Sequence, residues 1–394
     1  METNKNEVAI IQKDSHMITA VFRDKRLDNL IIDDIKNNSP NVGDIYVGRV
    51  SHIVQNINAA FIEIQKNVMC YMPLNEVNSF DGKVVQGQLF PVQIKKAAVK
   101  TKQAVASRKL EFTGRYAVIT TINTTKSISS KITSTAERAR LASLLEMFQE
   151  EDLGIILRTS CDGVDAVAIQ EECELLLKQA HDVIQRSQTR SAFTSLFIAD
   201  TEYMKYLRNF PEHSFARIVT DVPEVYQNVK QQLLTEEECL QFYEDRSYSL
   251  DKLLGISSKL EKALAKHVWL KSGGSLVIEP TEALTVIDVN TEKAIAGKRN
   301  SETTFYKLNC EAAIEAARQI RIRNISGIIL IDFIDMKKQE HIDELLRLLA
   351  KEFEKDDIRT TVVDMTKLGL VEITRMKVRK PLWETLSIPK REKF

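Results

Sequence analysis

The stretches LTVIDVN (284–290) and GIILIDFID (327–335) indicate the fold of the C-terminal part of the chain. Both are apolar runs rich in β-branched residues, which is the composition of buried strands. Each nevertheless carries an aspartate, and burying a carboxylate without a partner is costly or shifts its pKa strongly. The presence of an aspartate in each apolar run must therefore be explained by the elements around the two predicted strands.

The segments around these strands alternate between helix and strand patterns. We predict a helix over 301–323 with Ser301 as its N-cap, a helix over 340–356 and a strand over 359–365. Right-handed crossover connections make the three strands of such a β-α-β-α-β unit parallel in one sheet. Because parallel strands are usually covered on both faces, we expect both faces of this sheet to be buried.

The two aspartates lie where such sheets bind ligands. Asp288 lies near the C-terminal end of the first strand and Asp332 near the end of the second, so neighbouring strands bring the carboxylates within several ångströms. Carboxylates this close repel one another unless a cation lies between them. Oxygen ligands suit Mg²⁺ or Mn²⁺. Asn290, on the same strand face as Asp288, supplies an amide oxygen or orients a bound water.

Other roles for these acids stay open at this point. A lone aspartate at a strand end is more often a loop or capping residue than a metal ligand. Asp335 points to the opposite face from Asp332 if the strand continues that far, and we expect it to cap the next helix. The segment around Lys298 lacks the spacing of a nucleotide-binding P-loop.

The whole chain has 394 residues, a length that predicts roughly two to four units. Its 55 basic and 55 acidic residues balance, so a polyanionic partner must be recognised by a local patch. Neither a secretory signal nor a membrane-spanning apolar run is visible, which predicts a cytoplasmic protein. The five cysteines are scattered without a CxxC pair, so we expect reduced thiols and no zinc site.

The first part of the chain is rich in strand patterns. Residues 8–24 have the pattern of a β-hairpin, and 43–74 show short alternating runs broken by Gly or Asn, typical of a small barrel. The aromatic residues Tyr46, Phe61 and Tyr71 accompany this barrel. A basic stretch follows, which contains Lys95, Lys96, Lys100, Lys102, Arg108, Lys109 and Arg115.

Aromatic and basic residues on a small barrel suggest an OB-fold that holds a single-stranded nucleic acid, because aromatics stack bases and cations follow phosphates. The alternatives are an ordinary core position for Phe61 and a solvated surface for the lysines. Beyond the barrel, 118–195 mix helix and strand patterns, with helices predicted over 135–150 and 164–186 and a strand over 154–160. A single-strand binder joined to a divalent-metal site suggests a nuclease acting on single strands.

Several stretches resemble one family. TEALTVIDVNT (281–291), ARQIRIRNISGIILIDFIDM (317–336) and LGLVEITRMKVRKPL (368–382) resemble the catalytic region of bacterial ribonucleases E and G. GDIYVGRVSHIVQNINAAFIEI (43–64) resembles their OB-fold RNA-binding domain, and GIILRTS (154–160) their 5′-sensor. The resemblance covers most of the chain, approximately from residue 40 to residue 385.

The resemblance implies an α/β and β multidomain fold. A split RNase-H-like domain would comprise 1–40 and 196–278, with an inserted OB-fold domain at 41–117 and 5′-sensor domain at 118–195, followed by a DNase-I-like α/β catalytic domain at 279–394. The implied activity is that of a magnesium-dependent endoribonuclease. It would cleave single-stranded RNA to 5′-phosphate and 3′-hydroxyl ends, in rRNA maturation and mRNA turnover.

The resemblance also implies roles for individual residues near the two aspartates. The magnesium-binding aspartates of the family match Asp288 and Asp332, and its supporting asparagine matches Asn290. A bound Mg²⁺ would activate water and offset the charge that develops on the attacked phosphate. These three residues are the implied catalytic centre.

Two further groups of residues match RNA contacts of the family. The OB-fold contacts match Phe61, Tyr71 and Lys102, with Tyr71 in place of a common phenylalanine. The pocket for an RNA 5′-monophosphate matches the three residues Arg158, Thr159 and Arg359. Arginine suits that task because it forms bidentate, charge-assisted bonds with phosphate.

The chain also departs from the family pattern. The sensor loop often contains Gly-Ile-Ser, whereas Ser127 occupies the glycine position here. No cysteine pair follows the 368–382 segment, so a zinc-linked dimer is not supported, and a homodimer of this chain would form without the zinc link. The rival interpretations are a non-catalytic RNA-binding or ribosome-assembly factor and a DNA nuclease. The length is closer to that of ribonuclease G.

Overall fold

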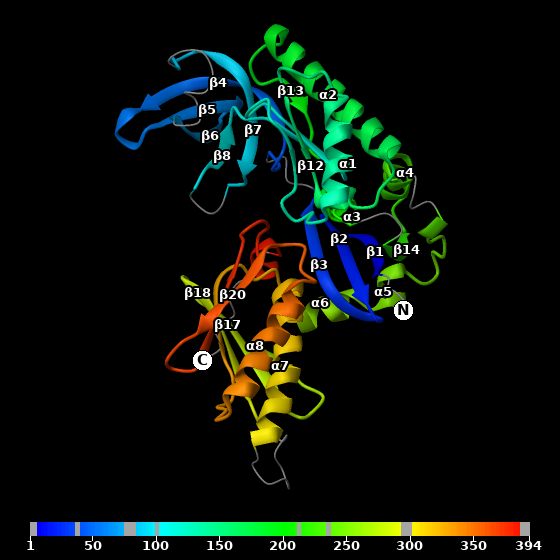
Figure 1. Ribbon diagram of the computed structural model, residues 1–394, viewed down its shortest axis with the longest axis vertical. Coiled ribbons are helices and arrows are strands. Elements are labelled where there is room, and N and C mark those ends of the chain that lie inside the picture. Colours follow the sequence, from blue (N-terminus) through cyan, green and yellow to red (C-terminus); the bar gives the residue numbers. More distant parts are fainter. Residues whose placement is uncertain are drawn as a thin grey trace. The chain divides into compact units, whose positions relative to one another are not determined.

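The computed structural model describes residues 6–35, 40–74, 84–98, 102–210, 214–233, 238–292 and 302–386 (Figure 1). The chain divides into two compact units, one formed by 1–36 with 212–394 and the other by 37–211. Ser301, the predicted N-cap, falls outside the described residues, as do Lys100 and Lys298. The four-domain boundaries implied by the resemblance stay a prediction.

The unit of residues 37–211 contains a closed five-stranded barrel. Its strands pair in the order β4 (Ile45–Val54), β5 (Ala59–Gln65), β6 (Val68–Pro73), β8 (Ala104–Ser107) and β7 (Leu89–Lys96). Antiparallel pairing of β4 with β7 closes the circle, and β13 (Ser195–Phe197) pairs with β4 from outside. The predicted small barrel is confirmed.

Alternation of apolar side chains explains why these strands close into a barrel. On β5, Ala60, Ile62 and Ile64 are buried, whereas Phe61 and Glu63 between them are half-buried and face outward. A Cβ at Gly48 on β4 would lie 2.5 Å from Cγ2 of Ile62, so the interior admits only glycine at this position. The interior of the barrel is therefore filled by apolar side chains, and the alternate side chains of β5 lie on its outer surface.

A four-stranded sheet completes this unit. Its strands pair in the order β11 (Lys126–Ile128), β12 (Gly154–Leu157), β10 (Ala117–Thr120) and β9 (Glu111–Thr113). Two helices pack against it, α1 (Thr135–Glu146) and α2 (Ala166–Thr189), and the short helix α3 (Glu202–Arg208) follows later in the chain. Ser134 and Asp165 cap the first two helices through their side chains. The predicted strand 154–160 ends early, because η3 (Thr159–Cys161) begins there.

The other unit begins with a five-stranded sheet. Its strands pair in the order β15 (Leu240–Phe242), β14 (Phe215–Thr220), β1 (Asn6–Lys13), β2 (His16–Arg23) and β3 (Arg26–Asp34). The predicted hairpin is confirmed as the antiparallel pair β1–β2. Its helices are α4 (Pro223–Gln232), α5 (Leu250–Leu254) and α6 (Ile256–Leu264).

A six-stranded sheet forms the rest of this unit. Its strands pair in the order β16 (His267–Trp269), β17 (Ser275–Pro280), β18 (Leu284–Asn290), β19 (Gly327–Asp332), β21 (Leu370–Arg375) and β20 (Thr360–Met365). The predicted strands β18, β19 and β20 run in the same direction, because β21 is antiparallel to both of its neighbours. The sequence analysis did not predict β21, which lies between β19 and β20.

Among the residues that the structure describes, helices cover only one face of this sheet. The helices α7 (Glu302–Ile322) and α8 (Gln339–Phe353) lie side by side along it (Figure 1), and the buried side chains of Ile287 and Ile331 belong to their common core. On the opposite face, Ile328 is 50% exposed. The expectation that both faces are buried is therefore wrong. Both crossovers advance the same way along the sheet, so right-handed connections place both helices on one side.

The last helix of the described chain is α9 (Leu382–Thr385), whose Leu382 joins the core of the N-terminal sheet. Within the part of the chain that the structure describes, no helix combines the length and apolarity needed to cross a membrane. All five cysteines are free thiols, as predicted.

Candidate active site

Asp288 and Asp332 are direct partners in the register of the adjacent parallel strands β18 and β19. Asp332 is the last residue of β19, and its side chain is exposed, whereas Asp288 is half-buried. The neighbouring residues Ile287, Val289 and Ile331 are buried under the helices. Both aspartates therefore lie at the carboxyl ends of the strands, as the sequence analysis expected, and on the face that the helices leave uncovered.

The proximity of the two carboxylates has an electrostatic consequence. Partial desolvation of the carboxyl at the strand end raises the pKa of Asp332, and the negative charges of Asp288 and Asp335 raise it further. Ionisation of Asp332 is thus less favourable in the protein alone than in a free aspartate side chain. A cation between the carboxylates would reverse this effect, because it compensates their mutual repulsion.

Asn290 holds the Asp288 side chain in place. Its Nδ2 donates a hydrogen bond of 2.8 Å to Oδ2 of Asp288, two residues earlier on the same strand face. The sequence analysis expected Asn290 to supply an oxygen ligand or to orient water. In the structure its amide nitrogen orients this carboxylate, and its expected role toward a metal ion or a water stays a prediction.

Asp335 takes a different position from the one expected. β19 ends at Asp332, so the strand does not continue to Asp335, and the N-cap of α8 is Lys338 without a capping side chain. The prediction that Asp335 caps the next helix is therefore wrong. Its charge acts on the pKa of Asp332, which shows that Asp335 belongs to the electrostatic surroundings of the aspartate pair.

The loop that leaves Asp332 is fixed by two residues of α7. Asn309 is fully buried, accepts a hydrogen bond of 3.1 Å from the Ile334 backbone N–H and donates one of 2.7 Å to the Ile334 carbonyl. Glu302 accepts hydrogen bonds from the backbone N–H groups of Lys337 and Lys338, and so replaces the missing side-chain cap of α8.

Sequence reasoning missed both of these residues. An asparagine at a core position of an apolar helix stripe was the available signal for Asn309, because buried amides need specific partners.

The donor set of the aspartate pair fits a hard divalent cation. Within the described ranges, which omit 293–301 among others, no three His, Cys, Asp or Glu side chains are placed to hold a metal together. Two carboxylates without a nearby thiol or imidazole ligand do not suit a soft metal. Magnesium keeps several waters and is commonly bound through one or two carboxylates and substrate phosphates, so the pair fits Mg²⁺.

A row of three rings crosses the outer face of the barrel. Phe61 on β5 is the register partner of both Tyr71 on β6 and His52 on β4. The Phe61 ring stacks on His52 with centroids 4.6 Å apart and meets Tyr71 edge-on at 6.1 Å. Sequence analysis selected Phe61 and Tyr71 but missed His52. Tyr46 is buried and its hydroxyl donates to Asp44, so this aromatic residue offers no exposed ring face.

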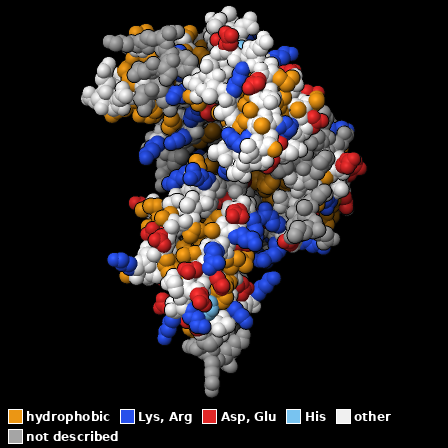
Figure 2. Space-filling model, in the orientation of Figure 1, with side chains coloured by type: hydrophobic (Ala, Val, Ile, Leu, Met, Phe, Trp, Pro, Cys, Tyr) orange, Lys and Arg blue, Asp and Glu red, His pale blue; other side chains and the backbone are white. Residues whose placement is uncertain are grey.

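The predicted basic stretch does not form one continuous face. Lys95 pairs with Glu111 at 2.5 Å, Arg108 stacks on the Phe90 ring at 4.5 Å, and Arg115 is buried. Lys102, two residues before β8, is exposed. Figure 2 shows basic and acidic side chains interspersed over the visible surface, in keeping with the zero net charge.

Arg158 and Thr159 lie together at the end of β12. Arg158 donates to the backbone oxygens of Gly114 and Arg115 at 2.6 and 3.3 Å and to Oδ1 of Asn209 at 2.9 Å. Burial lowers the pKa of its guanidinium. The hydroxyl of Thr159 is 2.9 Å from that of Ser129.

Two other residues of the predicted sensor lie elsewhere in the chain. Ser127 is on β11, as the register partner of Ile156. Arg359 belongs to the other unit, where it is exposed just before β20.

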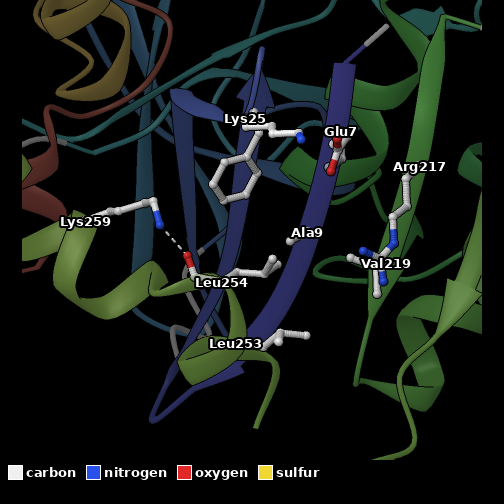
Figure 3. Close-up of a pocket in the computed structure, with 10 residues that line it drawn as sticks. Glu7, Ala9, Lys25, Arg217, Val219, Leu253, Leu254 and Lys259 are labelled. Carbon is white, nitrogen blue, oxygen red and sulfur yellow. Dashed lines mark hydrogen bonds between the residues drawn. The ribbon is translucent and has the colours of Figure 1, made fainter.

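A cavity of about 260 Å³ opens beside β1 and β14 (Figure 3). Glu7, Lys25, Arg217 and Lys259 contribute its charged lining, and none of the predicted site residues takes part. Two of these cations already have partners, since Lys259 donates to the Leu254 carbonyl and Arg217 to the Gln241 side chain at 2.8 Å.

Comparisons with known proteins match a part of the chain that includes both aspartates. A model of the Ribonuclease E/G family matches residues 111–378. A Ribonuclease E of Synechocystis sp. (strain ATCC 27184 / PCC 6803 / Kazusa) is 34% identical over 96% of this chain and 58% of its own length. A Ribonuclease G of Escherichia coli (strain K12) is 32% identical over 88% of this chain and 74% of its own length. The chain thus spans a little more than half of that Ribonuclease E.

Proposed function

Since this chain belongs to the ribonuclease E/G family, we propose that it is an endoribonuclease whose reaction centre is formed by Asp288 and Asp332. The observation that carries the proposal is the direct pairing of these two residues at the carboxyl ends of adjacent parallel strands. Ligands bind at the carboxyl ends of parallel strands. Two neighbouring carboxylates repel one another, and a bound cation compensates this repulsion.

Asp288 and Asp332 hold Mg²⁺ in this proposal, with Mn²⁺ as a substitute. A bound ion of this kind supplies a hydroxide-like water and charge compensation for an attacked phosphodiester. Asn290 keeps the Asp288 carboxylate in one orientation, and Asn309 keeps the loop after Asp332 in place. Hydrolysis in line with the leaving oxygen then yields a 5′-phosphate downstream and a 3′-hydroxyl upstream.

The barrel binds the single-stranded RNA substrate in this proposal, as an OB-fold. The outward rings of Phe61 and Tyr71 are available for bases, and His52 extends the row that they form. The exposed ammonium group of Lys102 contacts phosphate. The C-terminal six-stranded sheet and the N-terminal sheet correspond to the DNase-I-like and RNase-H-like domains of the resemblance.

Arg158 and Thr159 contact a 5′-terminal phosphate in this proposal. The Arg158 guanidinium is held by three oxygen acceptors and is therefore already oriented before a phosphate arrives. Arg359 stays a candidate through the resemblance alone. Such an enzyme would serve rRNA maturation and mRNA turnover in the cytoplasm, and a homodimer without zinc stays a prediction.

Replacing Asp332 with Asn tests the proposal directly. We expect the D332N variant to lose cleavage of a labelled single-stranded RNA by at least roughly a hundredfold in Mg²⁺, while RNA binding in EDTA is retained. Asp364→Asn is the matched control, because Asp364 is an exposed acid on β20, two strands away from Asp332 in the same sheet. Near-normal cleavage by D332N would show that Asp332 is not part of the reaction centre.

The same assay separates the rival functions. RNA binding without Mg²⁺-dependent cleavage by the unaltered protein would favour a non-catalytic RNA-binding factor. Equal cleavage of a matched single-stranded DNA would favour a general nuclease.

A further inference from the structure

Trp269 lies in the unit formed by 1–36 with 212–394, which we call the catalytic unit. Its side chain has no part in the core of this unit or in the proposed function. Trp269 is one of only two tryptophans in the chain, and its side chain is 64% exposed on the edge strand β16. An exposed indole leaves a large apolar surface in water, which is unfavourable in the absence of a partner. Single exposed apolar residues are common on protein surfaces, so what matters for Trp269 is where its indole lies in the sheet.

The register of the sheet places Trp269 on the same face as the aspartate pair. Trp269 is the partner of Ser275, and Ser275 is the partner of Asn290. One row earlier, His267 leads through Val277 to Asp288 in the same way. Directly paired residues share a face of a sheet, so the indole lies on the uncovered side.

Val268, which lies between His267 and Trp269 on β16, supports this orientation independently. Val268 packs into the core beneath α7, together with Leu276 and Val289. Successive side chains of a strand point to opposite faces, so His267 and Trp269 must point away from the helices. Both side chains are exposed in the structure.

The hairpin that carries Trp269 is well fixed. The Leu270 N–H donates to the Gly274 carbonyl at 2.8 Å, and Gly273 adopts the positive φ of +94° that this turn requires. Glu311 on α7 accepts hydrogen bonds from the backbone N–H groups of Lys271 and Ser272. Because these hydrogen bonds fix the hairpin, a ligand that binds the indole orders little additional backbone, so the loss of conformational entropy on binding is small.

Distance and the exposed aromatic face favour a nucleic-acid base as the occupant. Two strand spacings, about 10 Å, separate the backbone of Trp269 from that of Asn290, a distance suited to a base beside the reacting phosphate. Lys266 and Lys271 flank the strand, and Lys266 is also paired with Glu279. Every base has a π-face, so stacking on an exposed indole is tolerant of sequence.

We propose that Trp269 is a stacking platform for a base of single-stranded RNA next to the scissile phosphate. This inference rests on the proposed function, since it takes Asp288 and Asp332 as the reaction centre. It adds a substrate contact in the catalytic unit itself, separate from the aromatic row of the barrel.

Intrinsic fluorescence tests the proposal because Trp383 is the only other tryptophan in the sequence. In a Trp383→Phe background, we expect single-stranded RNA added in EDTA to quench Trp269 emission. An abasic oligonucleotide with the same number of phosphates should leave the emission almost unchanged. Equal quenching by both ligands, or no quenching by RNA, would overturn the proposal.

Variants of Trp269 provide the second measurement. Trp269→Ala should raise the Kd for RNA in EDTA by roughly tenfold, and Trp269→Tyr should restore most of the affinity. Leu175→Ala is the matched control, because Leu175 is an exposed apolar residue on α2, and it should bind RNA normally. Unchanged RNA affinity of Trp269→Ala would contradict the stacking role.

The indole could instead be covered by a second copy of the chain. Sedimentation analysis of the unaltered protein and of Trp269→Ala separates this case, since loss of a dimer with unchanged RNA affinity would overturn the proposal. All binding measurements are made without Mg²⁺. They therefore stay informative if D332N retains cleavage and the assignment of the reaction centre fails.

Discussion

Asn309 holds the backbone of Ile334 with both atoms of its side-chain amide, donating to the carbonyl at 2.7 Å and accepting from the N–H at 3.1 Å. Ile334 lies two residues after Asp332, so a fully buried residue of α7 fixes the loop that follows the end of β19. A carboxylate at a metal site depends on such supporting bonds for its orientation.

The first prediction concerns this support. Asn309→Ala should raise the Mg²⁺ concentration needed for half-maximal RNA cleavage by roughly tenfold, because the loop after Asp332 loses both hydrogen bonds. Its free energy of unfolding should fall by about 2 kcal/mol, since the backbone groups of Ile334 lose their buried partner. Urea unfolding and Mg²⁺ titration of cleavage measure the two effects.

Leu345→Ala is the control for this prediction, because Leu345 is fully buried on α8 and its truncation lowers stability by about 2–5 kcal/mol. It should leave the Mg²⁺ requirement unchanged. Equal Mg²⁺ shifts in both variants would show that Asn309 acts only through stability.

The second prediction concerns Asn290. Asn290→Ala removes the 2.8 Å hydrogen bond that orients Asp288, so we expect cleavage at low Mg²⁺ to fall by roughly 10- to 100-fold. High Mg²⁺ should recover part of the loss, because both carboxylates are still present. Cleavage rates over a Mg²⁺ series measure the effect, and a loss that Mg²⁺ cannot reduce would instead assign Asn290 a direct part in the reaction.

The placement of the aspartate pair could be predicted from sequence because three local signals agree. The apolar runs at 284–290 and 327–335 mark strands, the helical pattern between them marks a crossover, and the handedness rule makes the strands parallel. Asp288 and Asp332 then meet at one end of the sheet without further information. The closed barrel followed in the same way from short alternating runs.

The remaining features depend on pairing between distant segments. Residues 370–375 form β21 between β19 and β20, and no local pattern states where such a strand inserts. His52 joins the ring row only because β4 and β5 pair in one particular register. The position of Asn309 in an apolar helix stripe signals a specific partner, but only the structure shows that this partner is Ile334.

The third prediction concerns recognition of the RNA 5′ end. Arg158→Lys should reduce the preference for 5′-monophosphorylated over 5′-hydroxyl RNA by roughly tenfold, because lysine cannot form a bidentate bond with phosphate. Cleavage of the 5′-hydroxyl substrate should change little. Competition between the two labelled RNAs in one reaction measures the ratio directly.

Arg140→Lys serves as the control for this prediction, since Arg140 is paired with Glu137 in the same unit. An unchanged preference in Arg158→Lys, or an equal change in Arg140→Lys, would remove Arg158 from the 5′-end contact.

The last prediction concerns Glu315, which is buried on α7 and ties this helix to β3. Its carboxylate accepts hydrogen bonds from Arg318 at 3.0 Å, Gln319 at 2.9 Å and Arg26 at 3.2 Å. Burial alone would raise the pKa of Glu315, but the hydrogen bonds and charge of Arg318, with help from Gln319 and Arg26, lower it overall.

A carboxyl whose pKa is lower in the folded state than in the unfolded chain contributes stability above the unfolded pKa, near pH ~4.3. That contribution is lost as the pH falls through the lower folded pKa. Glu315→Gln should therefore reduce the free energy of unfolding by about 3 kcal/mol at pH ~7, because it leaves Arg318 without its counter-charge. The difference from the unaltered protein should shrink below pH ~4, where the native carboxyl also becomes protonated.

Urea unfolding of both proteins across this pH range measures the difference, with the exposed Glu261→Gln on α6 as the control. Glu261→Gln should change stability by less than about 0.5 kcal/mol at every pH. A Glu315→Gln difference that is constant with pH, or that grows in acid, would show that the ionised carboxylate of Glu315 does not stabilise the contact between α7 and β3.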